Sequence, residues 1–319
     1  MAASVLVGCD SSKGNDTTAA TTTGNPAVTT PAATTTGTPD PTVPEVTDDG
    51  WVSAVFGGGP FVTQISDTRY KTFDKLRSSG FNTAIVWSVH VHDDGSLWLN
   101  DIKVCDDGKI VAANRMTKRW NQIKGEGSSI TRVELSIGAW GCKDFEAIGA
   151  LMKRDGTGRD TELYQNFKAL IDAFDADAIN YDDETCYDPA ILTQFGEMCV
   201  DMGVKVTLCP YTYMDMWVQV KNNLGDAVDR IYVQCYDGGA GNRDQLAAWK
   251  KAFGMDVIPG LWAGKYNSFP SDLSSYLKQN SRSVTGGFLW LWDEMENVGS
   301  PNSVSDYADA INGQNKFAK

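Results

Sequence analysis

Short apolar segments alternate with amphipathic segments along the chain from Trp51 onward. The apolar segments are rich in β-branched and aromatic residues, which is typical of strands, and the amphipathic segments repeat their apolar positions at helical spacing. The sequence predicts eight strands: Val52 to Phe56, Thr83 to Val89, Arg132 to Ile137, Ala178 to Asp182, Lys205 to Cys209, Arg230 to Gln234, Asp256 to Leu261 and Gly287 to Trp292. It predicts helices over Thr68 to Ser78, Thr161 to Phe174, Pro189 to Met202, Arg243 to Phe253, Ser271 to Gln279 and Val304 to Ile311.

This alternation is the signature of repeated βα units, so the predicted fold class is α/β. Eight units that end in a βα unit favour closure into a single (β/α)8 TIM barrel over the alternative, an open doubly wound sheet. The stretch from Val91 to Ala113 interrupts the alternation after the second strand. Its two Asp-Asp-Gly turns, at 93–95 and 106–108, predict an inserted β-hairpin.

The first 49 residues differ in composition from the rest of the chain. Residues 11–49 consist mainly of Thr, Ala, Pro and Gly, so they cannot bury a core and are predicted to form a disordered linker. Residues 1–10 resemble a signal-peptide remnant, whose Leu-Val-Gly-Cys has the form of a lipobox ending at Cys9. We therefore expect a lipid anchor at Cys9, or else a free thiol there, an extracellular or cell-surface location, and a catalytic barrel over residues 50–319.

Charge and composition narrow the class of ligand. The formal net charge is −13, from 28 Lys and Arg against 41 Asp and Glu. This charge disfavours nucleic-acid and anionic membrane partners and favours neutral glycans, whose rings stack on aromatic faces such as those of the ten tryptophans. The cysteines after Cys9 form no CxxC pair, so we expect mostly free, buried thiols and no zinc or iron–sulfur site. We expect the chain to be a monomer.

Carboxyl groups gather at the end of the fourth predicted strand, between Asp177 and Glu184. Side chains alternate along a strand, so Asn180, Asp182 and Glu184 share one face, and Asp183 points away from it. Polar groups in line at the end of an apolar run are costly to bury. Burial and like charge raise a carboxyl pKa, which lets the group donate a proton at neutral pH. The pattern indicates an acid–base site, and the alternative for Glu184 is a structural ion pair.

Further polar and aromatic residues fall at the ends of other predicted strands. In a barrel the carboxyl ends of all strands meet at one rim, which carries the active site. Glu184 follows the fourth predicted strand, Tyr236 and Asp237 follow the sixth, and Trp292 ends the eighth. These residues, far apart in sequence, should therefore converge. Two more candidate platforms for a sugar ring lie at strand ends, namely Trp140 and Trp262.

The segment from Asp177 to Glu184 resembles the DxxDxDxE signature of glycoside hydrolase family 18, which includes chitinases and endo-β-N-acetylglucosaminidases. Asp177, Asp182 and Glu184 match it, whereas Asn180 stands where the family usually has Asp. Three further stretches resemble family motifs in the expected order: Ser136-Ile137-Gly138-Ala139-Trp140 the SxGG strand, Gln234-Cys235-Tyr236-Asp237 the QxYD strand, and Trp290-Leu291-Trp292-Asp293 the tryptophan-bearing last strand.

The resemblance implies a retaining glycosidase in which the substrate's own N-acetyl group is the nucleophile. Glu184 would be the general acid and then the base, and Asp182 would orient the acetamido group. Tyr236 would donate a hydrogen bond to the acetamido oxygen, and Trp292 would floor the sugar subsite. The remaining substrate contacts would come from the residues around them, Asn180, Asp237, Trp140 and Trp262. An amide at position 180 could donate a hydrogen bond to Asp182 but could not ionise, so the pH behaviour need not follow that of the family.

The implied substrate is an oligo- or polysaccharide that contains N-acetylglucosamine and is cleaved at a β-1,4 bond. Chitin and chito-oligosaccharides are the first choice. Two alternatives stay open: an endo-β-N-acetylglucosaminidase acting on N-glycan cores, and a glycan-binding barrel without catalysis. The stretch from Leu261 to Gly287 is too short for the α+β subdomain of processive chitinases, which predicts an open cleft.

His90 and His92 are the only histidines, and they lie at the end of the second predicted strand. Metal-dependent amidohydrolases carry such a pair, but their sites need further histidines, which this sequence does not contain. We therefore predict no metal and no cofactor, with one histidine as a rim contact to sugar and the other structural. A serine nucleophile is disfavoured, because no GxSxG motif occurs.

Overall fold

The computed structural model describes residues 50–62, 70–236, 242–264, 269–297 and 302–314. The predicted signal-peptide remnant, the linker and Cys9 lie outside the described residues, and so does Asp237. Among the residues that are described, no helix has the length and apolar character needed to cross a membrane.

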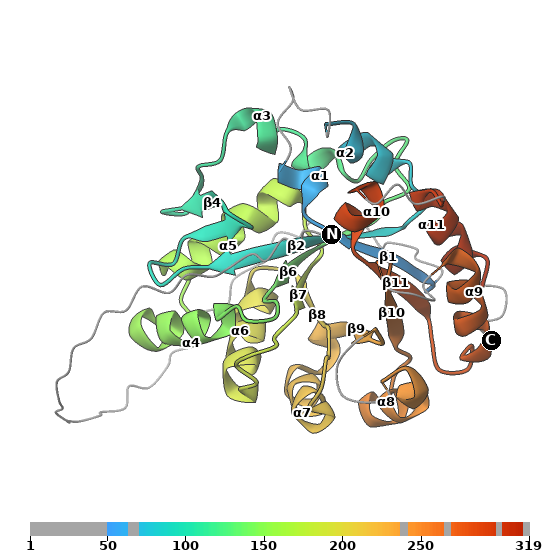
Figure 1. Cartoon of the computed structure of the whole chain (residues 1–319). Helices are drawn as coiled ribbons and strands as arrows, with labels where there is room; N and C mark the ends of the chain where they lie inside the picture. Colours follow the sequence, from blue (N-terminus) through green and yellow to red (C-terminus); the bar gives the residue numbers. More distant parts are fainter. Residues whose placement is uncertain (1–49, 63–69, 237–241, 265–268, 298–301, 315–319) are drawn as a thin grey trace, which may run out of the picture. The chain divides into compact units, whose positions relative to one another are not determined.

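Parallel strands form a closed barrel, which confirms the predicted (β/α)8 architecture (Figure 1). Each strand pairs with the next around the ring, and β1 pairs with both β2 and β11, which closes it. The barrel strands are β1 (Val52–Gly57), β2 (Thr83–Val91), β6 (Arg132–Ile137), β7 (Ala178–Tyr181), β8 (Lys205–Leu208), β9 (Val228–Gln234), β10 (Ile258–Trp262) and β11 (Gly286–Trp290).

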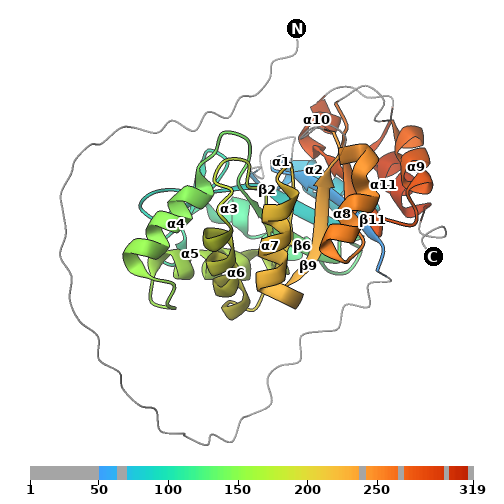
Figure 2. The same ribbon diagram turned by 90° about the horizontal axis from the view of Figure 1, so that it is seen from below.

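Helices cover the outside of the barrel, and Figure 2 shows α6, α7 and α8 side by side around it. They are α1 (Gly59–Val62), α2 (Tyr70–Arg77), α3 (Asn114–Thr117), α4 (Asp144–Asp155), α5 (Glu162–Phe174), α6 (Pro189–Asp201), α7 (Met214–Leu224), α8 (Leu246–Phe253), α9 (Pro270–Gln279), α10 (Trp292–Asn297) and α11 (Val304–Asn312). Short 3-10 turns lie at Trp120–Gln122, Gly225–Ala227 and Asn242–Gln245. The helices α4 and α7, and the short helices α1, α3 and α10, occupy stretches for which the sequence predicted no helix.

The predicted insertion after β2 is an antiparallel extension of the sheet. It consists of β3 (Leu97–Leu99), β4 (Ile102–Asp106) and β5 (Lys109–Ile110). The fully buried Asn166 of α5 holds both of its turns: its Nδ2 donates to the carbonyl of Gly95, and its Oδ1 accepts from the N–H of Gly108, each at 2.8 Å. Both glycines have a positive φ, of 88° and 66°, which explains why glycine stands at these turns. A single amide thus fixes the insertion to the helix layer.

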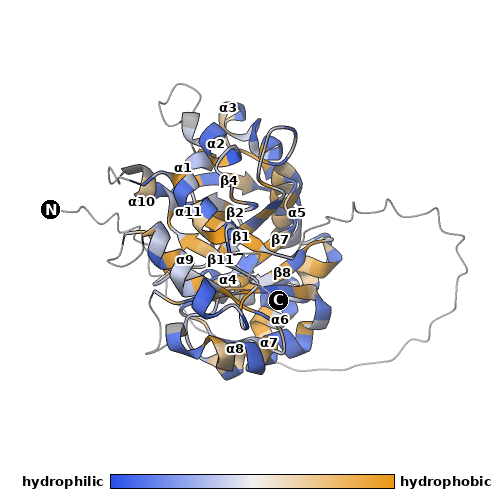
Figure 3. Ribbon diagram, turned by 90° about the vertical axis from the view of Figure 1, so that its right-hand side faces the viewer, coloured by the Kyte–Doolittle hydropathy of each residue, from blue (hydrophilic) through white to orange (hydrophobic). Residues whose placement is uncertain are grey.

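The inside of the barrel has an aromatic half and a polar half. In the aromatic half, Phe56 packs on Phe288 and Trp290, with ring centroids 5.2 and 5.7 Å apart. A second, larger apolar core lies between the strands and the helices, and Figure 3 shows hydrophobic strands in the middle and hydrophilic residues on the helices outside. The polar half is contributed by β6 to β9, whose inward side chains include Arg132, Glu134, Ser136, Asn180, Thr207, Arg230 and Gln234.

Candidate active site

Two carboxylates follow β7 at the C-terminal rim of the barrel. Asp182 is the first residue after the strand, is 3% exposed, and its N–H donates to the carbonyl of Ile137 at 2.9 Å. Gln234, the last residue of β9, joins this residue to Glu184: its Nε2 donates to Asp182 Oδ1 at 2.9 Å and to Glu184 Oε1 at 3.0 Å. The structure therefore brings the predicted acid and its neighbour together, and it adds a bridging amide that the sequence did not reveal.

The surroundings of Asp182 favour its protonated form. Burial raises the pKa of Asp182 well above its ordinary value, and the negative charge of Glu184 raises it further. The indole N–H of Trp87 and the thiol of Cys209 lie close enough to lower the pKa of Asp182. The indole N–H forms no hydrogen bond in this arrangement. Asp182 and Glu184 thus form an interacting pair that holds a proton at higher pH than an ordinary aspartate would.

An aromatic wall stands beside this pair. Tyr236 stacks on Trp290 at 6.2 Å and meets Trp262 edge-on at 6.3 Å. Burial raises the pKa of the Tyr236 phenol, and the nearby charges of Asp182 and Glu184 add to the effect, so the hydroxyl stays a hydrogen-bond donor at neutral pH. Trp290 also meets Trp87 of β2 edge-on, with ring centroids 4.5 Å apart. Carboxylates and an apolar surface are therefore contiguous, as binding and cleaving a sugar requires.

The tryptophan in this wall is not the predicted one. The sequence placed Trp292 at the end of the last strand, but β11 ends at Trp290, and Trp292 opens α10 with 1% of its surface exposed. A ring buried in this way cannot floor a subsite, so the prediction for Trp292 is wrong. Its neighbour Asp293 is also structural, because its carboxylate accepts the N–H groups of Gly58 and Gly59 at 2.9 and 2.8 Å.

Two other predicted platforms lie at strand ends. Trp140 follows β6 and is 74% exposed, which leaves its ring open to a ligand. Trp262 ends β10 and is partly buried, and its indole N–H donates to the carboxylate of Glu294 in α10. Trp262 also touches Tyr236, so it belongs to the wall beside the carboxylates, whereas Trp140 belongs to the outer rim.

Tyrosines from the loops after β7 and β8 add to the rim. Tyr187 and Tyr213 meet edge-on with centroids 4.6 Å apart, and Tyr213 is 61% exposed. Burial raises the pKa of Tyr187, and the next largest cause is the charge of Glu184, which places this ring close to the acid. Neither tyrosine was predicted from the sequence, although the position of each just after a barrel strand was an available signal.

Asn180 does not contact Asp182 in the way that the sequence suggested. Its side chain is fully buried inside the barrel, so it offers no surface to a substrate in this conformation. Its Nδ2 donates to Thr207 Oγ1 at 2.9 Å, and its Oδ1 accepts from Ser136 Oγ at 3.0 Å. The amide is therefore directed along the sheet to the strands on either side and not up toward the rim.

Asp183 points away from the site, as predicted from the alternation of side chains. It is 1% exposed, and its carboxylate accepts the backbone N–H groups of Thr185, Cys186 and Tyr187 at 2.7 to 3.1 Å. These bonds turn the chain back from β7 toward α6. Asp183 therefore shapes the loop that carries Glu184 and Tyr187 and is not a reacting group.

The two histidines have different surroundings. His90 is buried, with Nδ1 3.0 Å from Asp144 Oδ2 and Nε2 3.0 Å from Ser88 Oγ, whereas His92 is exposed and stacks on Trp98 at 4.6 Å. Across the described parts of the chain, one group has metal-ligand atoms within 4.8 Å of one another, and it consists of His90, Cys142 and Asp144. The cysteines from 105 to 235 are all free and mostly buried, which confirms that prediction.

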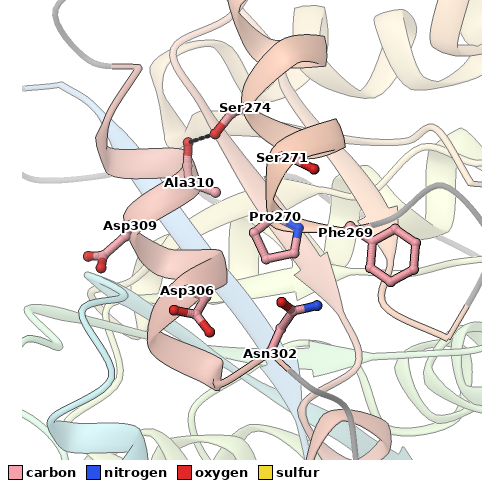
Figure 4. A pocket seen from close by; sticks show the side chains of 8 residues that line it. All are labelled: Phe269, Pro270, Ser271, Ser274, Asn302, Asp306, Asp309 and Ala310. Atoms are coloured by element: carbon pink, nitrogen blue, oxygen red, sulfur yellow. Dashed lines mark hydrogen bonds between the residues drawn. The ribbon is translucent and has the colours of Figure 1, made fainter.

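An open hollow of about 770 Å³ lies between α9 and α11, outside the barrel (Figure 4). None of the predicted site residues lines it. Asp306, which faces it, caps the start of α11 by accepting the N–H of Ser303 at 2.6 Å. Its lining residues are Phe269, Pro270, Ser271, Ser274, Asn302, Asp306, Asp309 and Ala310.

Solved structures of chitinases share the fold of this chain. The GH18 chitinase ChiB of Flavobacterium johnsoniae matches with a TM-score of 0.57 and 10% identity, over 82% of this chain and 93% of that one. The chain has the fold of the family 18 chitinases. The group IV chitinase of Ostrinia furnacalis in complex with allosamidin matches this chitinase-type barrel with a TM-score of 0.56 and 12% identity, over 84% of this chain and 99% of the other.

The catalytic domain of a hyperthermophilic chitinase from Pyrococcus furiosus matches with a TM-score of 0.55 and 10% identity, over 84% of this chain and 98% of that one. At such low identity the likeness establishes the chitinase-type fold and not the activity. No family model and no curated protein matches the sequence.

Proposed function

We propose that this protein is a retaining glycoside hydrolase that cleaves β-1,4 bonds in glycans containing N-acetylglucosamine, with chitin or chito-oligosaccharides as substrate. The observation that carries the proposal is the pair of Asp182 and Glu184, bridged by Gln234 at the C-terminal rim next to Tyr236 and Trp290. An acid–base pair against an aromatic wall suits a reaction in which a sugar ring stacks while its glycosidic bond breaks.

The reaction proceeds by substrate assistance. Glu184 gives its proton to the glycosidic oxygen, while the N-acetyl oxygen of the substrate attacks the anomeric carbon and forms an oxazolinium ion. Glu184 then takes a proton from the water that opens this ring, so the configuration is retained. The intramolecular attacker has a large effective concentration, which means that the protein needs no nucleophilic carboxylate of its own.

The residues around the acid hold the acetamido group during this step. Asp182 accepts the acetamido N–H, whose positive charge grows as the oxazolinium forms, and Tyr236 donates its hydroxyl to the acetamido oxygen. Trp290 floors the subsite in place of Trp292. The raised pKa of Asp182 means that the anion it needs becomes available only as the pH rises, so the acidic limb of the rate profile reports the titration of the pair.

The similar solved structures named above are chitinases, which supports chitin-type chains ahead of N-glycan cores as the proposed substrate. Between β10 and β11 the described residues form the single helix α9, and the segment is too short for a further subdomain, so the cleft stays open for cuts within a chain. The lipobox-like Cys9 and the linker support a cell-surface location, where such polymers are met.

The proposal is tested by offering chito-oligosaccharides and, separately, a high-mannose glycoprotein, with product identification by mass and by anomeric NMR. We expect cleavage of the chito-oligosaccharides with the β-anomer as the first product. Glu184→Gln should reduce the rate by a factor on the order of 10² or more while oligosaccharide binding persists. Cleavage of the glycoprotein alone would establish the endo-β-N-acetylglucosaminidase alternative, and binding without cleavage would establish a glycan-binding barrel. A first product with the α-anomeric form would overturn substrate assistance.

A further inference from the structure

A buried carboxylate, Glu134, lies inside the barrel beneath the proposed site. It stands on β6 two residues before Ser136 and is fully buried. Its Oε1 accepts hydrogen bonds from Arg132 Nε and from the Tyr232 hydroxyl, both at 2.8 Å, and Arg230 Nη1 lies 3.7 Å away. Two arginines and a phenol therefore stabilise the negative charge of Glu134 at Oε1. The other oxygen, Oε2, remains able to accept a hydrogen bond from a further neighbour.

That neighbour is Thr207 of β8. Its hydroxyl donates to Glu134 Oε2 at 2.6 Å. A threonine hydroxyl has one hydrogen, so once it is given to Glu134 the oxygen can only accept from its other side. There it meets Asn180 Nδ2 at 2.9 Å, and Asn180 Oδ1 in turn accepts from Ser136 at 3.0 Å.

The order of these groups is built into the sheet. Ser136 of β6 pairs in register with Asn180 of β7, which pairs in register with Thr207 of β8. The hydrogen bonds therefore run in one direction, from Ser136 to position 180 and from position 180 to Thr207. Only a side chain that donates to Thr207 and accepts from Ser136 satisfies both neighbours. A neutral amide does this, and an ionised carboxylate does not, because it can only accept.

We propose that Glu134 is a positioning residue of the active site, which acts through Thr207 to require a neutral amide at position 180. This inference rests on the proposed hydrolytic function and deepens it. Its consequence for the chemistry is that Asp182 interacts with Glu184 and has no ionisable partner at position 180. The titratable and charged side chains that face this part of the barrel are, from β6, Arg132 and Glu134; after β7, Asp182 and Glu184; after β8, Cys209; and from β9 onward, Asp229, Arg230, Tyr232 and Tyr236.

The substitution Asn180→Asp should disrupt these hydrogen bonds, and lower stability, only at a pH at which the new carboxyl group ionises. Below pH of about 4, the ordinary aspartate pKa, the new carboxyl is protonated in both folded and unfolded chains and can donate to Thr207 as the amide does. At higher pH the unfolded chain ionises freely, whereas the folded chain must keep the proton or bury an anion against the Thr207 oxygen. Folded stability should therefore fall as the pH rises above about 4.

The decisive comparison is with the double variant Glu134→Gln/Asn180→Asp, which moves the carboxylate and keeps the net charge. A glutamine amide at 134 can donate to Thr207, whose hydrogen is then free to turn toward the acid at 180. In thermal unfolding from pH 4 to 8, we expect Asn180→Asp to lose on the order of 5 °C at pH 7 and little at pH 4, and the double variant to show at most half of this drop between the two pH values. The drop is the quantity compared, because Glu134→Gln also removes the charge that compensates Arg132 and Arg230 and so lowers stability at every pH. Asn222→Asp, at an exposed position of α7, controls for the added charge.

Two results would contradict the inference. A loss in Asn180→Asp that is the same at all pH values would show that ionisation at 180 is not the cause. A double variant that loses as much stability between pH 4 and pH 7 as Asn180→Asp does would show that Glu134 does not impose the amide. This comparison needs no substrate, so it stands whether or not the protein hydrolyses the glycans offered.

The link to catalysis is read from the pH dependence of hydrolysis. In the double variant the acid at 180 becomes a neighbour of Asp182, so the acidic limb of the kcat profile should move relative to that of the unsubstituted protein. A merely structural role for Glu134 would change the height of the profile and leave the limb in place. An active double variant with an unmoved limb would therefore remove Glu134 from the site while leaving the proposed hydrolysis intact.

Discussion

Gln234 offers the most direct test of the carboxylate pair. Its Nε2 lies 2.9 Å from Asp182 Oδ1 and 3.0 Å from Glu184 Oε1, and the residue is 3% exposed. Gln234→Met keeps the length and approximate volume of the side chain and removes both donors. Asp182 and Glu184 should then no longer be held at a fixed distance from each other. They should also lose the amide N–H groups that stabilise their negative charge.

The size of the effect follows from the strength of these bonds. A hydrogen bond to a charged group contributes about 1.5–3 kcal/mol, and each 1.4 kcal/mol corresponds to about a tenfold change in rate. Loss of one bond in the transition state therefore slows the reaction roughly 10- to 150-fold, and we expect kcat to fall about 10²-fold. Because a donor to the anionic form has been removed, the pKa of Asp182 should rise further, and the acidic limb should move to higher pH.

The assay is the initial rate of chito-oligosaccharide hydrolysis as a function of pH, with thermal unfolding measured in parallel. Gln165→Met, on the exposed face of α5, is the matched control and should retain both the rate and the profile. A Gln234→Met protein with an unchanged kcat and an unmoved acidic limb would refute the role of the bridge. A lower rate explained fully by unfolding would refute it as well.

Further predictions concern stability, the aromatic wall and metals. The pKa of Asp182 is raised in the folded state, so the ionisation of Asp182 lowers stability progressively as the pH rises above about 4. At pH 7 Asp182→Asn should therefore melt at a higher temperature than the unsubstituted protein, whereas near pH 3 the two should melt at the same temperature. Hydrolysis should be lost in this variant. Trp290→Ala should raise KM for chito-oligosaccharides with a modest loss of stability, whereas Trp292→Ala should cost about 3–5 kcal/mol in urea unfolding, because Trp292 is buried against Gly57 at the end of β1. EDTA should leave the rate unchanged, and recovery of a lost rate by a divalent ion would implicate His90 and Asp144 instead.

The strands were predictable because each is a short apolar run, and every observed end lies within two residues of the predicted one. The missed helices α4 and α7 begin at residues that make no side-chain capping bond, so the sequence carries no start signal for them. By contrast, α5, α6 and α11, which were predicted, begin with the capping side chains of Thr161, Asp188 and Ser303. Capping side chains thus mark three of the predicted helices, whereas α8 was predicted from its apolar spacing alone, because its N-cap Gln245 makes no side-chain capping bond.

The site was predictable where its residues lie on one segment. Asp182 and Glu184 were found together because a single strand end carries both. The sequence predicted Trp292 in the position that Trp290 occupies. Both tryptophans lie on one face if the strand is extended, so the alternation of side chains alone could not show that β11 ends at Trp290. The partners of Asn180 come from other strands, 27 and 44 residues away, and only the register of the barrel brings them together.

Closure of the barrel depends on contacts between residues from opposite ends of the domain. β1 pairs with β11, and Trp51 Nε1 donates to the carbonyl of Ile311, 260 residues further along the chain. During synthesis, β1 therefore has one open edge until almost the entire domain has emerged, and open edges invite association with other chains. Folding should be completed late and as one event, so that chains interrupted before β11 aggregate or are degraded and do not persist as smaller stable barrels.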